Sequence, residues 1–196
     1  MTDPDSPLAT APRLGTPERV ARQRELLTLD AFYDSHRTLW LRYATLQVGD
    51  RDQAARLVRA VRDQLAQDWE QVLRRQSVPE YAWAALKDHI HGWLAERGRL
   101  PVMADTAAFH AAVRKLLLPE HQDGFEVLER ELGLYSAIGE LTERQSDVVV
   151  LRYVLHAGDH DIAAYLGTTA DAVRAHVAHA KARLALRLRT APGEQP

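Results

Sequence analysis

Apolar residues recur along most of the chain at intervals of three and four positions, and alternating β-branched runs are nearly absent. This spacing predicts an all-α fold with helices at 18–28, 30–47, 51–75, 79–97, 105–118, 124–139, 143–155, 159–166 and 170–189. The run VVVLRYV at 148–154 could pass for a strand, but its flanks are helical in character. We therefore expect a helix there as well.

Residues that favour helix ends mark several of these boundaries. Pro79 suits the first turn of a helix, where its missing N–H leaves no hydrogen bond unmade. Thr142, followed three residues later by Gln145, forms a capping-box pattern before the helix at 143. Gly167 suits a helix end with positive φ, and Thr169 is a natural N-cap for the helix that follows.

The pattern divides the chain into two helical modules between polar ends. Proline and small polar residues predict flexible tails at 1–17 and 191–196. We expect the first helical domain at 18–98 and the second at 134–190. Residues 99–133 would then form a linker that is itself partly helical.

Composition narrows the class of protein. The 196 residues suffice for one ordinary domain or two small ones, and a hydrophobic content of 46% allows a packed core. The absence of cysteine excludes disulfides and thiol chemistry and is in keeping with a reducing cytosol. No apolar run approaches the ~18 residues of a membrane span, and the first residues lack the features of an export signal. We therefore expect a cytoplasmic protein.

The sequence also lacks the motifs of an enzyme. It has no phosphate-binding loop, no dinucleotide-binding glycine motif and no nucleophile elbow, so we expect neither enzymatic activity nor a cofactor. Close histidine pairs occur at His89 and His91, His156 and His160, and His176 and His179. Because no cysteine or nearby glutamate completes a ligand set, we expect no metal.

The stretch LGTTADAVRAHVAHAKARL at 166–184 has the pattern of the second half of a helix-turn-helix. Ile162 and Leu166 give the preceding helix an apolar face, and Val173 and Val177 would pack the next helix against it. The N-terminal part of such a second helix enters the major groove of DNA. The alternative is a helical hairpin with a solvated basic face.

Local charge favours the DNA-binding alternative. The formal net charge is −2, so any contact with DNA has to come from a local patch. Five cations oppose a single acid over residues 170–190, and phosphate binding requires such an excess. The candidate DNA-binding residues are Thr169, Ala170, Asp171, Ala172, Arg174, Ala175, His176, His179, Lys181 and Arg183.

Four segments in this part of the chain resemble a known family. They are LTERQ (141–145), VVVLRYV (148–154), DIAAYLG (161–167) and DAVRAHV (171–177). In this order they are similar to region 4 of extracytoplasmic-function (ECF) sigma factors of the sigma-70 type, although LuxR-type response regulators share a similar helix-turn-helix. The resemblance implies binding to the −35 element of double-stranded promoter DNA.

An upstream stretch resembles region 2 of the same family. LDAFYDSHRTLWLRYATLQVGDRDQAARLVRAV (29–61) is similar to its first helix, turn and second helix. The resemblance implies docking on core RNA polymerase through an acidic face, but AARLVRAV (54–61) carries arginine and alanine where the family has acids. The candidate docking residues are Arg56, Leu57, Val58, Arg59 and Arg62.

The segment YAWAALKDHIHGWLAERGR (81–99) stands where the family melts and reads the −10 element. The candidate DNA contacts there are Lys87, His89, His91, Arg97 and Arg99. Trp83 and Trp93 could stack on unpaired bases, but large aromatics usually belong to helical cores, and we expect a core role.

Three functions stay open. The first is a divergent ECF sigma factor that directs transcription initiation by docking on core polymerase and binding promoter DNA. The second is a sigma-derived regulator that binds DNA or protein and no longer docks on polymerase. The third is an interaction protein whose basic helix faces a protein partner. An anti-sigma-like protein is a further expected partner, because related modules close on each other when an inhibitor holds them.

Overall fold

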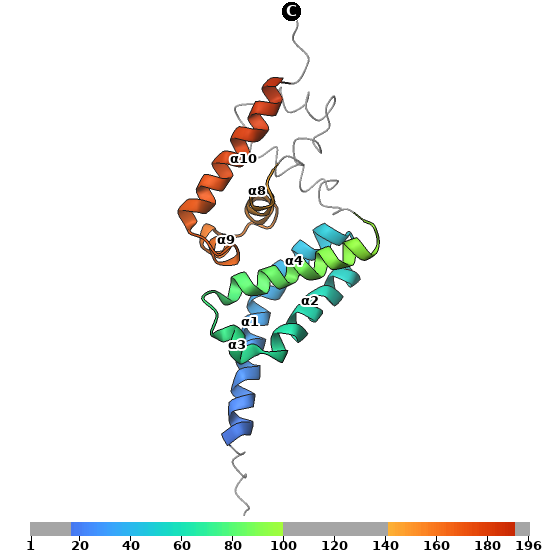
Figure 1. Cartoon of the computed structure of the whole chain (residues 1–196), viewed down its shortest axis with the longest axis vertical. Coiled ribbons are helices and arrows are strands. Elements are labelled where there is room, and N and C mark those ends of the chain that lie inside the picture. The colour runs from blue at the N-terminus through green and yellow to red at the C-terminus, as the bar shows by residue number, and fades with distance from the viewer. Residues whose placement is uncertain (1–16, 100–140, 191–196) are drawn as a thin grey trace, which may run out of the picture.

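The computed structural model describes residues 17–99 and 141–190, and within these two ranges every regular element is a helix (Figure 1). This confirms the predicted all-α fold. The helices expected at 105–118 and 124–139 lie outside the described residues. No helix in the described part of the chain is long and apolar enough to cross a membrane.

The first element, α1 (Pro17–Val48), is one continuous helix where the sequence predicted two. No glycine or proline interrupts it near the expected break, and Leu29 at that point is fully buried. The N-terminal turns project beyond the other helices (Figure 1), and Leu26 and Leu27 are exposed there. Only the later part of α1, which contains the buried Trp40, packs into the bundle.

The next two elements are α2 (Arg51–Gln67) and α3 (Trp69–Leu73), where the sequence predicted one helix over 51–75. The chain leaves helical geometry at Asp68, whose φ is −132°. The break turns Trp69 and Val72 into the core, and the Trp69 indole Nε1 donates a hydrogen bond to Thr28 Oγ1 at 2.9 Å. Burial of a large aromatic side chain outweighs one lost helical turn.

Helix α4 (Val78–Glu96) is capped by Ser77, whose side chain accepts a hydrogen bond from the backbone N–H of Glu80. Pro79 lies in its first turn, as predicted. Its buried face includes Trp83 and Leu86, and it packs against both α1 and α2.

The C-terminal helices are α8 (Glu143–Val149), the π-helical turn η3 (Val150–Val154), α9 (Asp159–Tyr165) and α10 (Ala170–Thr190). The predicted capping box of Thr142 and Gln145 is present in both directions. The VVVLRYV run is helical, as expected, and ends in the wider π turn. His156 follows with a positive φ of 58°.

The two sets of helices, α1–α4 and α8–α10, share one continuous hydrophobic core. Helix α4 packs on α9 across the boundary, and Figure 1 shows α8 and α9 lying along the upper side of α4. Trp83 of α4 contacts the ring of Tyr43 at a centroid distance of 4.5 Å and that of Tyr165 at 5.0 Å. The described part of the chain is therefore closed, with aromatic side chains at the boundary.

Candidate nucleic-acid interface

Helices α9 and α10 form the helix-turn-helix that the sequence predicted. Ile162 and Ala163 of α9 and its C-cap residue Leu166 are buried, and Val173 of α10 is fully buried. Further along α10 the buried positions are Ala180 and Leu184, while Val177 is only partly buried. This packing fixes the angle at which α10 leaves the turn.

The turn between the two helices is held by local geometry. Gly167 has a φ of +57°, which glycine adopts at little cost, and a Cβ there would overlap the carboxylate of Glu80. The N–H of Thr168 donates to the Ala163 carbonyl at 2.9 Å. The Thr169 hydroxyl accepts from the Ala172 N–H at 3.2 Å, so both end signals read from the sequence are confirmed.

The first turns of α10 present a polar face that the packing leaves open. Its exposed residues are Thr169, Asp171, Arg174, Ala175 and His179, and its partly buried residues are Ala170, Ala172, His176 and Lys181. Arg183 is exposed one turn further along. The structure thus brings the candidate −35 residues together on one helix, with small side chains between the polar ones.

Acidic residues near Arg174 reduce the positive charge of this face. Its guanidinium pairs with Asp171 one turn earlier and with Asp159 Oδ2 of α9 at 3.4 Å. Arg152 shares Asp159 at 2.8 Å. Asp159 was not among the residues picked out from the sequence, because only the fold brings the first turn of α9 beside Arg174. The N-terminal part of the face is close to neutral, and further along lies Arg183, which makes no ion pair with a residue in the described ranges.

The candidate −10 residues on α4 do not gather at one place. His89 interacts with Gln64 at 2.9 Å, whereas His91 is exposed. The guanidinium groups of Arg97 and Arg99 lie over the ring of Trp93, at 4.4 and 5.5 Å from its centroid. Trp83 is buried in the core, as expected, while Trp93 is only partly buried.

Lys87, the remaining candidate on α4, lies at the boundary between the two sets of helices. Its ammonium is 2.9 Å from Asp147 Oδ2 of α8 and also pairs with Glu143. The Tyr43 hydroxyl donates to the other oxygen of Asp147 at 3.2 Å. These contacts join α1, α4 and α8 through one carboxylate that is only 6% exposed.

Burial sets the protonation behaviour of this cluster. Burial raises the pKa of Asp147 above its usual value, although Lys87 opposes the shift. Burial by itself would lower the pKa of Lys87, but the charge of Asp147 and hydrogen bonds to both carboxylates raise it. Burial also raises the pKa of Tyr43, and the Asp147 charge adds to the effect. The ammonium therefore stays charged and holds the carboxylate in place.

The candidate polymerase-docking residues on α2 differ in exposure. Leu57 and Val58 are buried against the core, whereas Arg56 and Arg59 are exposed. Arg62 is partly buried and pairs with Asp30 of α1 at 2.6 Å. The exposed side of α2 at this point is consequently basic. Among the described residues, no group of three histidine, aspartate or glutamate side chains is placed to hold a metal ion.

Comparison with known families identifies the C-terminal helices. Residues 132–184 match the family described as Sigma-70, region 4, and this stretch contains α8, η3, α9 and most of α10. Comparison with curated proteins gives no match. The matched family consists of DNA-binding transcription factor domains and not of enzymes, in agreement with the sequence prediction. Residues 132–184 are thus similar to sigma-70 region 4, and this match supports a DNA-binding role for the helix-turn-helix of α9 and α10.

Proposed function

We propose that this protein is a divergent ECF-type sigma factor that binds double-stranded promoter DNA through α10. The observation that carries the proposal is the exposed polar face of the first turns of α10, on a helix-turn-helix whose turn and N-cap are complete. Binding to promoter DNA also requires a cytoplasmic location.

Within this proposal the residues of α10 have different tasks. Arg174 and His176 lie in the first turns, which enter the major groove in helix-turn-helix proteins. Lys181 and Arg183 lie further along, where cations meet phosphates and position the protein. We assign 18–98 to a region 2-like domain, 99–133 to the linker and 134–190 to region 4.

Duplex binding by the full chain tests the proposal. Fluorescence anisotropy against a selected promoter duplex should show that Arg174→Ala weakens specific binding by about 1–3 kcal/mol, if the guanidinium reads a guanine edge. Arg183→Ala should weaken binding to all sequences alike. It should also reduce the slope of the logarithm of the binding constant against the logarithm of the salt concentration by about 1. Arg56→Ala, on the remote α2, is the matched control. Failure of the wild-type chain to bind any duplex selected from a random pool would refute the proposal.

A second candidate function is a sigma-derived regulator that no longer docks on polymerase. The observation that favours it is the basic exposed side of α2, where Arg56 stands in place of an acid of the family and Arg59 in place of a glutamine. Like charges at an interface repel and weaken binding. A polymerase surface that complements the acidic face of the family would therefore bind the basic side of α2 poorly. The region 2-like helices would then contact another protein, and an anti-sigma-like protein is one such partner.

Co-purification with core RNA polymerase separates the two candidates. A stable complex at physiological salt supports the sigma factor, and its absence, together with retained duplex binding, supports the regulator. If neither polymerase nor any duplex is bound, a pure interaction protein is the remaining function.

A further inference from the structure

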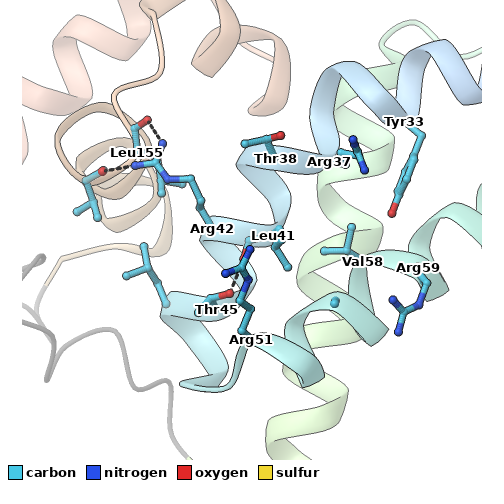
Figure 2. Close-up of a pocket in the computed structure, with 13 residues that line it drawn as sticks. Tyr33, Arg37, Thr38, Leu41, Arg42, Thr45, Arg51, Val58, Arg59 and Leu155 are labelled. Carbon is cyan, nitrogen blue, oxygen red and sulfur yellow. Dashed lines mark hydrogen bonds between the residues drawn. The ribbon is translucent and has the colours of Figure 1, made fainter.

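A pocket with a volume of about 940 Å³ lies between α1, α2 and the end of η3 (Figure 2). We call it the arginine pocket. Its lining on α1 runs from Tyr33 to Leu46, α2 contributes residues between Arg51 and Arg59, and the end of η3 completes the wall. Sites for small organic molecules usually have volumes of about 300–1,000 Å³. The arginine pocket is therefore large enough to hold a small ligand.

The wall of the pocket is largely aliphatic. Six of the thirteen lining residues have aliphatic side chains, and only Tyr33 is aromatic. Val58 of α2 and Leu155 after η3 are buried, and Leu41 of α1 is partly buried. Contact with such side chains favours the hydrocarbon part of a ligand, because it removes apolar surface from water.

The charged residues of the lining are all arginines, and none of the thirteen residues is acidic. Two of the four arginines already have partners. Arg37 pairs with Asp34, which lies outside the lining. Arg42 donates hydrogen bonds to the carbonyls of Val154 and Leu155, at 3.3 and 3.4 Å.

The other two arginines, Arg51 and Arg59, are exposed and make no ion pair with any residue in the described ranges. They are eight positions apart on α2, which is about 12 Å along the helix axis. Figure 2 shows them at separate places on the α2 side of the pocket. A guanidinium binds a carboxylate through two parallel N–H donors, so each of them offers a site for one carboxylate.

The lining lacks the features that hold a nucleotide. Phosphates are commonly bound by backbone N–H groups of glycine-rich loops and helix N-termini, and none of the lining residues is glycine. At the start of α2, the Asp50 carboxylate already accepts two backbone N–H groups, at 2.8 and 2.9 Å. The ring of Tyr33 already contacts Trp40 and Arg62, at 6.3 and 5.8 Å from its centroid. A single carboxylate on an aliphatic chain suits this lining better.

We propose that the arginine pocket binds a medium-chain fatty carboxylate. The carboxylate pairs with Arg51 or Arg59, and the hydrocarbon chain lies along Leu41, Val58 and Leu155. An extended chain advances roughly 1.2 Å per bond, so about ten carbons cover the ~12 Å that separates the two arginines along α2. The proposal goes beyond the proposed function and does not depend on DNA binding by α10.

Isothermal titration calorimetry of the full chain at physiological salt tests the proposal with four probes. Decanoate is the expected kind of ligand, octanoate has two methylene groups fewer, octanol lacks the charge, and ATP lacks the hydrocarbon chain. We expect saturable binding of one decanoate, with a negative heat-capacity change because apolar surface is buried. Octanoate should bind about tenfold more weakly than decanoate. Octanol should bind about tenfold more weakly than octanoate, and ATP should not bind.

Replacing the two unpaired arginines locates the carboxylate. The double variant Arg51→Gln, Arg59→Gln removes both charges and keeps good helix formers in α2. It should weaken decanoate binding about tenfold or more and leave octanol binding unchanged. Arg56→Gln is the matched control, because Arg56 is an exposed arginine of the same helix that does not line the pocket. It should change decanoate binding by less than about twofold. Circular dichroism checks that each variant keeps its helices.

Four results would each overturn the proposal. They are no saturable binding of decanoate at millimolar concentration, equal affinities for decanoate and octanoate, tighter binding of ATP than of decanoate, and an equal loss in Arg56→Gln and the double variant. Duplex binding is measured on the same samples. Failure of this proposal and failure of the proposed function are therefore distinguished.

Discussion

Replacing Lys87 with Met tests the buried ion pair that joins α4 to α8. Met keeps the length of the aliphatic stem and removes the charge. Among the described residues, the Asp147 carboxylate then keeps the Tyr43 hydroxyl as its hydrogen-bond partner, at 3.2 Å, while it remains 6% exposed. Removing one member of a buried pair costs about 3–5 kcal/mol, because the other charge is left uncompensated.

Protonation of Asp147 sets a ceiling on this loss. Neutralising a carboxyl with the ordinary pKa of 3.8 costs about 4 kcal/mol at pH 7 and about 1.6 kcal/mol at pH 5. In the variant, Asp147 becomes protonated when the free energy of protonation is smaller than that of keeping its carboxylate charged and buried without Lys87. We therefore expect Lys87→Met to lower the free energy of unfolding by about 3 kcal/mol at pH 7 and by no more than about 1.6 kcal/mol at pH 5.

Urea unfolding followed by circular dichroism at both pH values measures the loss. Arg74→Met is the matched control: it breaks the exposed pair with Glu70 and should cost less than about 1 kcal/mol at either pH. The double variant Lys87→Met, Asp147→Leu removes both charges and should recover stability to within about 1 kcal/mol of wild type. A loss below about 1 kcal/mol at pH 7, or an equal loss at pH 5 and pH 7, would refute the reasoning.

Three further changes test single contacts. Thr169→Ala removes the N-cap of α10 and should cost about 1 kcal/mol in urea unfolding, while Thr169→Ser should cost little. His156→Gly relieves a left-handed backbone at an exposed position and should raise the free energy of unfolding by about 0.5–1 kcal/mol; an unchanged midpoint would contradict this. Burial lowers the pKa of His36, against the opposing charge of Asp161, so the folded protein binds its proton less readily than the unfolded chain. Stability should therefore fall as the pH drops below 6.5, and His36→Gln should remove that part of the pH dependence.

Local signals were enough to predict the helix-turn-helix. Gly167 and Thr169 fix the turn through their own backbone and side-chain preferences, and the capping box at Thr142 starts α8 in the same way. Such contacts join residues only a few positions apart, so a local pattern in the sequence is enough to predict them. The buried face of α10 followed from helical spacing for the same reason.

Features that depend on distant contacts were missed. The break at Asp68 exists because Trp69 reaches Thr28, some forty residues earlier. Asp159, which pairs with Arg174, belongs to another helix, and no rule of helical spacing relates these two residues. The sequence offered Lys87 as a candidate DNA contact and gave no sign of its ion pair, because its partner Asp147 lies 60 positions away. Residues this far apart in the sequence come into contact only through tertiary packing, which the pattern of a single sequence does not predict.

The position of Lys87 bears on how α4 could meet DNA. In the closed arrangement its ammonium is held by Asp147 and Glu143 and its side chain is only 18% exposed, so it is not available to a phosphate. Contact with a −10 element through Lys87 requires its ion pair with the buried Asp147 to break. His91, Arg97 and Arg99 bear no such cost, since they are exposed outside the ion pair. A −10 contact made in the closed state must therefore come from the C-terminal half of α4, whereas a contact through Lys87 would report that the two sets of helices have separated.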